Sequence, residues 1–268
     1  MKIHPTAIVE TGAEIEEEVE IGPYACIGAK VKIGPRTIVQ SHAVIEGAVR
    51  IGADNLIGHG AILGAAPQDL SFKSGTPSSV QIGNHNTIRE HVTIHRGTAA
   101  NSATRIGDDN FLMAGAHLGH NCTLGNKVII ANNCLLGGYV SVDDGAFLGG
   151  ASIFHQFVRI GRLAMIRGGA ALSKDMPPFV IAVEENMVAG LNVIGLRRAG
   201  FSAEERAEIR RAFRLLYESG LNVSQALAQA RAQTWSAPAQ QFFDFVAAAR
   251  RGIPALRRTR EAAASDDG

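Results

Sequence analysis

The sequence has little cysteine, little net charge and no long apolar run. Its three cysteines, Cys26, Cys122 and Cys134, show no spacing typical of a metal site or a disulfide framework, so inert thiols in a reducing cytoplasm are expected. A net charge of +1 gives no reason to expect a nucleic-acid partner. The opening MKIHPTAIVE enters a repeat at once, and no apolar stretch could span a bilayer. We therefore expect neither a signal peptide nor stable membrane insertion.

The usual periods of a helix and a strand are also missing from most of the chain. Aliphatic residues instead recur every six positions, often followed by glycine, in three series: Ile3 to Leu63, Ile82 to Ile94 and Ile106 to Leu172. Such hexads are typical of a parallel β-helix, in which three of them form a coil of about 18 residues. The residues two positions before each aliphatic are mostly small or β-branched, which suits a narrow interior. The pattern predicts a mainly β fold with between about eight and nine coils.

Two interruptions and a change of composition divide the chain. The repeat is broken at 64–81 and 96–105, and we expect a loop that leaves the β-helix at each place. The pattern stops after Leu172, near Pro177 and Pro178. The sequence therefore predicts a hexapeptide-repeat β-helix over 1–178 and a connector with a C-terminal helical domain over 179–268.

The helical domain is expected to cover the last open edge of the β-helix. Residues 179–200 are interpreted as an irregular connector. Ser202 and Glu205 form the pattern of a capping box, Ser224 is expected to cap a second helix, and Pro238 to begin a third. The three expected helices end near residues 219, 233 and 252. The tail RRTREAAASDDG is expected to be frayed.

Polar residues that interrupt the aliphatic repeat are the candidates for chemistry. His117 and His120 lie in AGAHLGHNCTLG, Tyr139 in LLGGYVSVDD, and His155 with Gln156 in IFHQFVRIG. Because positions about 18 apart stack on neighbouring coils, these residues should gather on one edge of the β-helix. The stacking rule places His120 beneath the glycine at position 138.

A histidine on this edge suits general-base catalysis near neutral pH. His95, in TIHRGT, is expected nearby, whereas four further histidines are interpreted as solvated turn residues: His42, His59, His85 and His91. Three imidazoles could also bind zinc, but no HxxxH spacing with a carboxylate supports that reading. We expect neither a metal nor another cofactor.

Several motifs together resemble one enzyme family. HPTAIVE, PQDL, TIHRGT, AHLGHNCTLGN, FHQF, DMPPFVIA and GLRRAGFS are similar to UDP-N-acetylglucosamine acyltransferases, and the similarity covers essentially the whole chain. The resemblance implies a left-handed parallel β-helix, a homotrimer, and active sites in clefts between adjacent chains. It also implies that a 3-hydroxyacyl group moves from acyl carrier protein to the 3-hydroxyl of UDP-N-acetylglucosamine, the first step of lipid A biosynthesis.

The resemblance assigns roles to individual residues. His120 matches the general base, and the backbone N–H of Gly138 matches the oxyanion donor. Gly168 matches the position that limits acyl-chain length, and the absence of a side chain implies a chain of roughly fourteen carbons. The remaining matches are substrate-binding residues: Gln68, Asp69, His95, His117, Tyr139, His155, Gln156, Asn192 and Arg198. Among these, the PQDL pair is implied to act from a neighbouring chain's loop, and Asn192 and Arg198 to hold the uridine and phosphate end.

Four positions depart from the family pattern. Asn121 stands where an aspartate often follows the catalytic histidine, and Tyr139 where a histidine is usual. Ser71 replaces a common lysine, and Ile194 an acidic residue. These departures leave open an acyltransferase that uses acyl-CoA or a different nucleotide sugar, such as one with a 3-amino group. A non-catalytic or metal-dependent hexapeptide protein is a third alternative.

Overall fold

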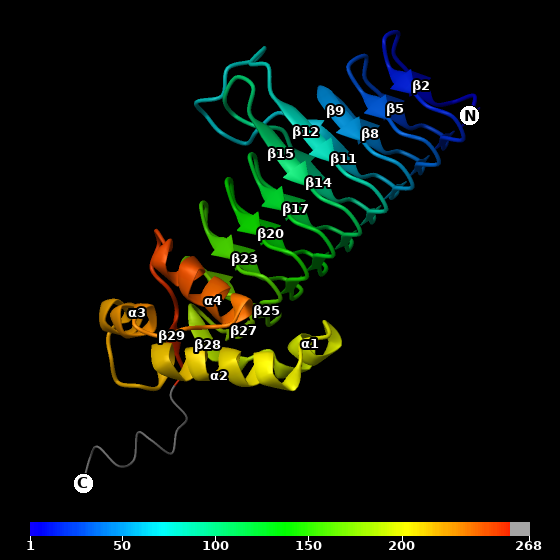
Figure 1. The fold of residues 1–268 in the computed structure, drawn as a ribbon. Coiled ribbons are helices and arrows are strands. Elements are labelled where there is room, and N and C mark those ends of the chain that lie inside the picture. Colours follow the sequence, from blue (N-terminus) through cyan, green and yellow to red (C-terminus); the bar gives the residue numbers. More distant parts are fainter. Residues whose placement is uncertain (258–268) are drawn as a thin grey trace.

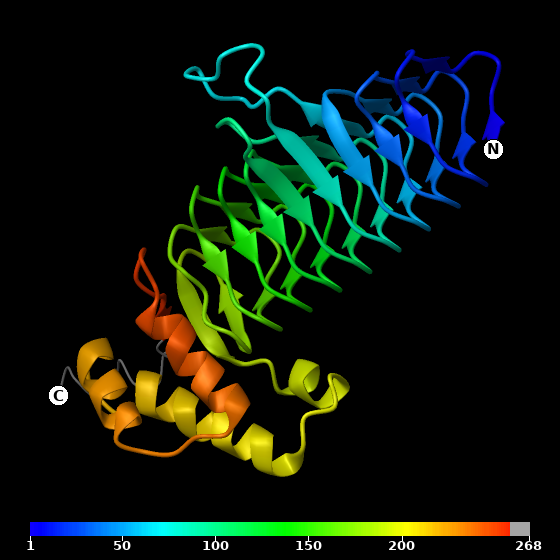
Figure 2. The same ribbon diagram turned by 45° about the horizontal axis from the view of Figure 1, so that its top comes forward.

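Three parallel sheets wind into a three-sided prism, which the helices cap at its C-terminal end (Figures 1 and 2). This computed structural model describes residues 1–257, so all but the first residue of the expected frayed tail lies outside the described part. The fold class predicted from the hexads and the resemblance is confirmed: the chain is mainly β, a left-handed parallel β-helix with a helical cap.

Each sheet receives every third strand of the β-helix. The first sheet contains β1 (Lys2–Ile3), β4 (Glu20–Ile21), β7 (Ile38–Val39), β10 (Leu56–Ile57), β13 (Thr87–Ile88), β16 (Phe111–Leu112), β19 (Ile129–Ile130), β22 (Phe147–Leu148), β25 (Met165–Ile166), β27 (Val180–Val183), β28 (Met187–Leu191) and β29 (Ala255–Leu256). The second contains β2 (Ile8–Val9), β5 (Cys26–Ile27), β8 (Val44–Ile45), β11 (Ile62–Ala65), β14 (Thr93–His95), β17 (His117–Leu118), β20 (Leu135–Leu136), β23 (Ile153–Phe154) and β26 (Ala171–Leu172). The third contains β3 (Glu14–Ile15), β6 (Lys32–Ile33), β9 (Ala48–Ile51), β12 (Ser79–Ile82), β15 (Ala103–Ile106), β18 (Thr123–Leu124), β21 (Ser141–Val142) and β24 (Arg159–Ile160).

The aliphatic residues of the hexads form the core of the prism. Ile21 pairs in register with Val39 on the next coil, and Val39 with Ile57; all three are almost fully buried. The small residues that precede the aliphatics are buried too, as Ala25 and Ala43 show. Stacking of like side chains buries a continuous apolar column that a single hexad could not bury alone.

A ladder of buried asparagines holds the coils in register where the loops interrupt the repeat. Asn55 Oδ1 accepts hydrogen bonds from the backbone and side-chain N–H groups of Asn86, at 2.9 and 3.0 Å. Asn86 Oδ1 accepts the same pair from Asn110, both at 2.9 Å, and Asn110 Oδ1 accepts from the Val128 N–H at 2.8 Å. The sequence offsets are 31 and 24 at the first two steps and 18 at the third, so the ladder spans both insertions.

The two loops leave the same corner of the prism and contact each other. They occupy residues 66–78, between β11 and β12, and residues 96–102, between β14 and β15. Both are shorter than the expected interruptions because the flanking residues pair in strands. The Asn101 N–H donates to the Pro77 carbonyl at 2.7 Å, and the Arg96 guanidinium lies over the Phe72 ring, 5.2 Å from its centre.

The connector is ordered, contrary to the expectation of an irregular segment at 179–200. β27 and β28 form an antiparallel hairpin on the first sheet, β29 adds a parallel strand beyond it, and α1 spans Val193–Arg198. Strands as well as helices therefore close the last edge. On the third sheet, the Asp175 carboxylate accepts hydrogen bonds from the backbone N–H groups of Arg159 and Arg250, at 2.9 and 3.0 Å.

Three longer helices complete the cap. α2 spans Ala203–Tyr217, and the capping box of Ser202 and Glu205 is confirmed. α3 spans Val223–Arg231, but its cap is Asn222 instead of Ser224: Asn222 Oδ1 accepts from the Gln225 N–H, and the Asn222 N–H donates to Gln225 Oε1. α4 spans Ala237–Ala247, with Pro238 in its first turn. It ends well before residue 252, because the chain turns there to reach Asp175 and β28. Within residues 1–257 no helix has the length and apolarity to cross a membrane.

Candidate active site

Five of the predicted site residues lie in the turns that follow the strands of the second sheet, and four more lie on those strands or on the loop at 66–78. We call this edge of the prism the second corner; it includes residues 96–102, 119–122, 137–140 and 155–158. His117 pairs with Leu135, and Leu135 with Ile153, so the turns after β17, β20 and β23 stack on one another. The gathering of these residues on one edge, expected from the 18-residue coil, is present.

His120 is held between three groups of the second corner. Its side chain is buried, with 6% of the residue exposed. The imidazole Nδ1 lies 3.1 Å from the side-chain oxygen of Asn121, and the ring meets the Tyr139 ring edge-on at 5.2 Å between centres. A Cβ atom at Gly138 would lie only 2.4 Å from His120 Cε1. The glycine therefore makes room for the imidazole itself.

Gly138 also offers a backbone donor beside the imidazole. The N–H groups on either side of it are used, since Gly137 donates to the Phe154 carbonyl at 3.0 Å and Tyr139 to the His120 carbonyl at 2.8 Å. Among residues 1–257, the Gly138 N–H has no hydrogen-bond acceptor. An imidazole next to an unpaired N–H is the arrangement needed for a base and an oxyanion donor.

Two further imidazoles lie nearby, that of His117 on the same coil as His120 and that of His95 on the preceding coil. His95, at the end of β14, is 7% exposed and meets the His117 ring edge-on at 5.0 Å. Burial, helped by the neighbouring His117, His120 and Arg96, lowers the pKa of His95 to about 4. Burial also lowers the pKa of His117, whose Nδ1 lies 2.7 Å from Thr93 Oγ1. Both rings are thus suited to hydrogen bonding as neutral groups.

The loop at 66–78 brings Asp69 towards the His120 of its own chain. Asp69 Oδ1 accepts hydrogen bonds from the Ser71 N–H at 2.8 Å and the Ser71 hydroxyl at 2.7 Å. These bonds lower the pKa of Asp69, and the charge of His120 adds to the effect. Gln68 is exposed on the same loop.

His155 and Gln156 are exposed at the C-terminal end of the second corner. His155 Nδ1 lies 3.1 Å from the Gln156 carbonyl oxygen. A cavity of about 270 Å³ opens beside them and is lined by Ile153, Phe154, His155, Ala171, Leu172, Ser173, Glu185 and Asn186. The outward side chains of Leu135 and Ile153, 45% and 49% exposed, continue an apolar strip from His117 towards this cavity.

Three predicted residues lie away from the second corner. Asn192 caps α1: its oxygen accepts from the Gly195 N–H at 2.9 Å, and its amide donates to the Leu163 carbonyl at 2.9 Å. Its contribution within this chain is therefore to anchor α1, whose last residue is the exposed Arg198. Gly168 follows β25 of the first sheet, and a Cβ there would lie 3.1 Å from the Gly150 carbonyl oxygen.

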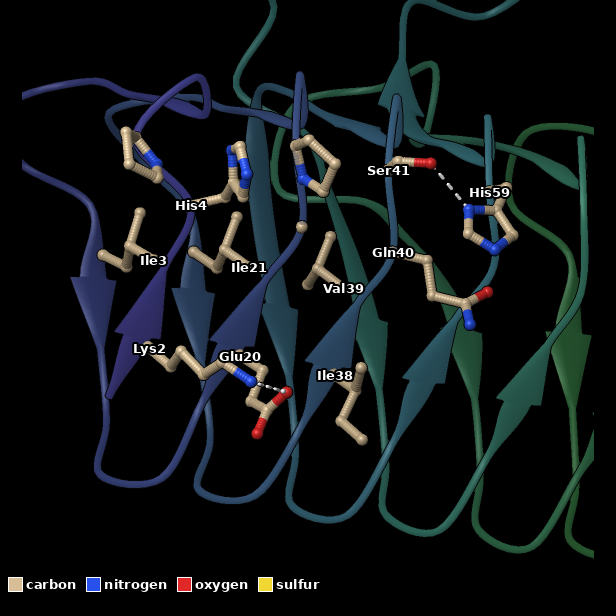
Figure 3. Close-up of a pocket in the computed structure, with 13 residues that line it drawn as sticks. Lys2, Ile3, His4, Glu20, Ile21, Ile38, Val39, Gln40, Ser41 and His59 are labelled. Atoms are coloured by element: carbon tan, nitrogen blue, oxygen red, sulfur yellow. Dashed lines mark hydrogen bonds and ion pairs between the residues drawn. The ribbon is translucent and has the colours of Figure 1, made fainter.

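A further hollow lies away from the second corner. A cavity of about 520 Å³ lies near the N-terminal end of the prism, along the first sheet and the turns that follow it (Figure 3). None of the predicted site residues lines it. His59, one of its lining residues, is hydrogen-bonded through Nδ1 to Ser41 Oγ at 2.7 Å. Over residues 1–257, no group of three or more His, Cys, Asp and Glu side chains is placed to hold a metal ion.

Sequence reasoning missed Thr98, which contacts the site from the loop at 96–102. Its N–H and hydroxyl both donate to Asn121 Oδ1 at 3.0 Å, and its oxygen lies 3.1 Å from the Tyr139 hydroxyl. The only sequence signal was the interruption of the repeat, which marked the loop but not the residue.

Two family models match the chain. One, described as UDP-N-acetylglucosamine O-acyltransferase, domain 2, covers residues 175–254. The other, bacterial transferase hexapeptide (six repeats), covers 12–47 and 103–138. Both matches agree with the observed division into a repeat region and a helical region.

Curated relatives match almost the full chain. An acyl-[acyl-carrier-protein]–UDP-N-acetylglucosamine O-acyltransferase from Paraburkholderia phymatum is 49% identical, and the match covers 94% of this chain and 98% of the relative. One of the same name from Halorhodospira halophila is 46% identical, with the same coverage.

Solved structures agree with these relatives. A UDP-N-acetylglucosamine acyltransferase from Bacteroides fragilis has a TM-score of 0.90 and 42% identity, covering 93% of this chain and 98% of its own. The enzyme from Francisella novicida has a TM-score of 0.91 and 36% identity, covering 97% and 96%. With relatives of up to 49% identity over almost the whole chain, and with the repeat and the cap both matched, the chain belongs to the UDP-N-acetylglucosamine O-acyltransferase family.

Proposed function

We propose that the protein transfers a 3-hydroxyacyl group from acyl carrier protein to the 3-hydroxyl of UDP-N-acetylglucosamine, the first step of lipid A biosynthesis. The relatives at 45–49% identity carry the name of this O-acyltransferase. The observation that carries the proposal is the contact of the buried His120 imidazole with Gly138, whose N–H is free to bind a developing negative charge.

The reaction needs a base and an oxyanion donor in turn. His120 Nε2 takes the proton from the sugar 3-hydroxyl as that oxygen attacks the thioester carbonyl carbon. The carbonyl oxygen becomes an oxyanion and accepts a hydrogen bond from the Gly138 N–H. When the intermediate collapses, the carbon–sulfur bond breaks and the protonated His120 returns its proton to the leaving thiolate. The products are the sugar ester and the free thiol of the carrier protein.

Other residues at or beside the second corner bind the substrates. His95 and His117 offer neutral imidazoles for sugar hydroxyls, and Asp69 offers an ionised carboxylate beside the base. The exposed strip of Leu135 and Ile153 offers apolar surface to the acyl chain.

More distant residues extend this assignment. His155, Gln156 and Gln68 are exposed and able to contact the sugar or phosphates, and Arg198 presents a guanidinium suited to the diphosphate. Gly168, on a different corner, contributes to an acyl groove that crosses the second sheet.

The proposal includes a homotrimer in the cytoplasm. Ile8, Ile62, Leu135 and Ile153 expose apolar side chains on the outer face of the second sheet. On the loop at 66–78, Leu70 is fully exposed. A flat repeated face with such residues suits closed cyclic association, and a cleft between chains would cover the acyl strip. Sedimentation of the purified protein tests this part: a stable, fully active monomer would contradict it.

Mass spectrometry of the reaction products tests the chemistry. The purified protein is incubated with UDP-N-acetylglucosamine or its 3-amino analogue, and with 3-hydroxyacyl groups carried by acyl carrier protein or by coenzyme A. The expected product is the ester of UDP-N-acetylglucosamine, formed from the carrier-protein donor. A product formed only from the 3-amino sugar, or only from the coenzyme A thioester, would replace the proposal by the corresponding alternative.

A further inference from the structure

The imidazole of His120 is attached to a short chain of hydrogen bonds that begins on the loop at 96–102. Asn121 Oδ1 lies 3.0 Å from the Thr98 backbone nitrogen, 3.0 Å from Thr98 Oγ1 and 3.1 Å from His120 Nδ1. Thr98 Oγ1 lies 3.1 Å from the Tyr139 hydroxyl. The Tyr139 ring, stacked on Phe157 at 4.9 Å, also meets the imidazole edge-on at 5.2 Å.

The Thr98 backbone N–H fixes the direction of all the other hydrogen bonds in this series. The Thr98 backbone N–H can only donate, so the group of Asn121 that faces it must be the carbonyl oxygen and not the amide nitrogen. An amide oxygen can only accept, so Nδ1 of neutral His120 must carry the proton. The lone pair of the ring is then on Nε2, the atom that the proposed reaction uses as a base.

The same logic orients the two hydroxyl groups. The Thr98 hydroxyl donates its single proton to a hydrogen bond with Asn121 Oδ1. Tyr139 is therefore the donor in its contact with Thr98 Oγ1. Its hydroxyl is engaged within the protein, and its ring limits the rotation of the imidazole.

The Asn121 backbone is fixed independently of this chain. Its N–H donates to Thr104 Oγ1 at 2.8 Å, and the Thr104 hydroxyl donates to the His95 carbonyl at 2.6 Å. Asn121 has a φ of 61°, in the left-handed region that asparagine tolerates better than most residues. Both the backbone and the amide of Asn121 are thus held in one orientation.

We propose that Thr98 and Tyr139 are positioning residues which, acting through Asn121, hold His120 as the Nδ1–H tautomer without any carboxylate. The inference rests on the proposed function only in the assignment of Nε2 as the base. It gives Tyr139 a role in place of the substrate contact expected from sequence, and it gives the loop at 96–102 a function. A neutral amide orients the ring as a carboxylate would, but it does not add a charge to it.

Nuclear magnetic resonance of the imidazole nitrogens tests the tautomer directly. The full-length protein, labelled with ¹⁵N-histidine, is studied at a pH of about 8.5, where exposed histidines are neutral. The His120 signals are identified by their loss in His120→Gln. We expect a protonated Nδ1 and an unprotonated Nε2. A proton on Nε2, or an even mixture of tautomers, would overturn the proposal.

Matched substitutions test the individual contacts. Asn121→Ala removes the acceptor, and we expect an even mixture of tautomers with a loss of about 10² in kcat. Asn121→Asp keeps an acceptor oxygen and should restore the tautomer. Thr98→Val should lower kcat about three- to tenfold, because it removes one hydrogen bond but keeps the backbone donor. Thr98→Ser, which keeps the hydroxyl, should match the wild type. Thermal unfolding of each variant establishes that it is folded.

Kinetics of Tyr139→Phe separate positioning from substrate binding. A positioning role predicts a lower kcat with an unchanged KM for the UDP-sugar. A raised KM with unchanged kcat would return Tyr139 to the substrate site and overturn its part of the proposal. The tautomer is measured without substrate, so its result stands apart from the reaction. Observation of Nδ1–H in a protein that does not acylate UDP-N-acetylglucosamine would sustain the positioning and refute the proposed function.

Discussion

His59 and His120 occupy equivalent positions of the same turn on two different corners of the prism. Each is the second residue after an inward aliphatic, Ile57 or Leu118, and each precedes a residue with left-handed φ, Gly60 or Asn121. His59 is nevertheless exposed and bonded to Ser41, as Figure 3 shows, whereas His120 is buried against Gly138. The repeat provides both positions, so the repeat alone does not make a site.

The difference comes from the neighbouring coils. The turns that follow the strands of the first sheet form the first corner. There, the residues stacked before and after His59 are Ser41 and Glu90, which leave the imidazole in water. At the second corner, Thr98 of the loop at 96–102 holds Asn121 beside the His120 ring, and Gly138 leaves space for the ring. An imidazole becomes a candidate base where its surroundings remove water and fix its tautomer.

Removal of each imidazole is the strongest test of this comparison. His120→Ala should lower kcat by about 10² to 10⁴, the usual effect of losing a general base, with little change in UDP-sugar binding. His59→Ala is the matched control and should leave kcat unchanged. Initial-rate kinetics of both variants provide the measurement. Equal losses in the two variants, or a loss of binding with unchanged kcat in His120→Ala, would reject the assignment.

Glycine at the turn provides a second pair. Gly138 and Gly150 occupy the same turn position on the second and first corners, but a Cβ would lie 2.4 Å from His120 in one case and 3.3 Å from the Asn132 carbonyl oxygen in the other. Gly138→Ala should displace the imidazole and lower kcat by about 10², whereas Gly150→Ala should have a small effect. Steady-state kinetics and thermal unfolding separate displacement from loss of fold. Wild-type kcat in Gly138→Ala would show that the close contact is unimportant.

Acyl-chain length tests whether the first corner contributes to function at all. Without a side chain at Gly168, we expect a preference for donors of roughly fourteen carbons over ten, by up to about two orders of magnitude at about 0.8 kcal/mol per methylene. Gly168→Met should move the preference to shorter chains. Competition between donors of different length measures this change. A wild-type preference for ten carbons that Gly168→Met does not alter would place the end of the groove elsewhere.

The smallest expected effect concerns pH and stability. Because the pKa of His95 is about 4 in the folded protein and about 6.5 in an unfolded chain, only the unfolded state binds the proton between these values. His95 should therefore make the free energy of unfolding fall as the pH drops from about 6.5 to about 4. Denaturant titrations should show a weaker pH dependence in His95→Gln than in the wild type. His59→Gln, which removes an exposed histidine, is the control; an equal change in both variants would argue against burial as the cause.

The sequence predicts the prism well because the six-residue period is a direct record of its geometry. Stacking at about 18 residues also places His120 against Gly138 without any coordinates. The rule fails for Thr98 and Asp69, because loops of irregular length carry them to the corner and no period describes a loop. The predicted cap of α3 is wrong for a different reason: Asn222 and Ser224 are both good caps, and the contact of Asn222 with Gln225 decides between them.

The asparagine ladder makes the register of the coils independent of the length of the loops. Asn55, Asn86 and Asn110 connect coils across chain offsets of 31 and 24 residues as well as across the ordinary offset of 18. The loops between them can therefore be replaced by longer or shorter ones while the strands of the three sheets stay in register. A family built in this way can diversify its substrates by loop replacement and leave the His120 imidazole where it is.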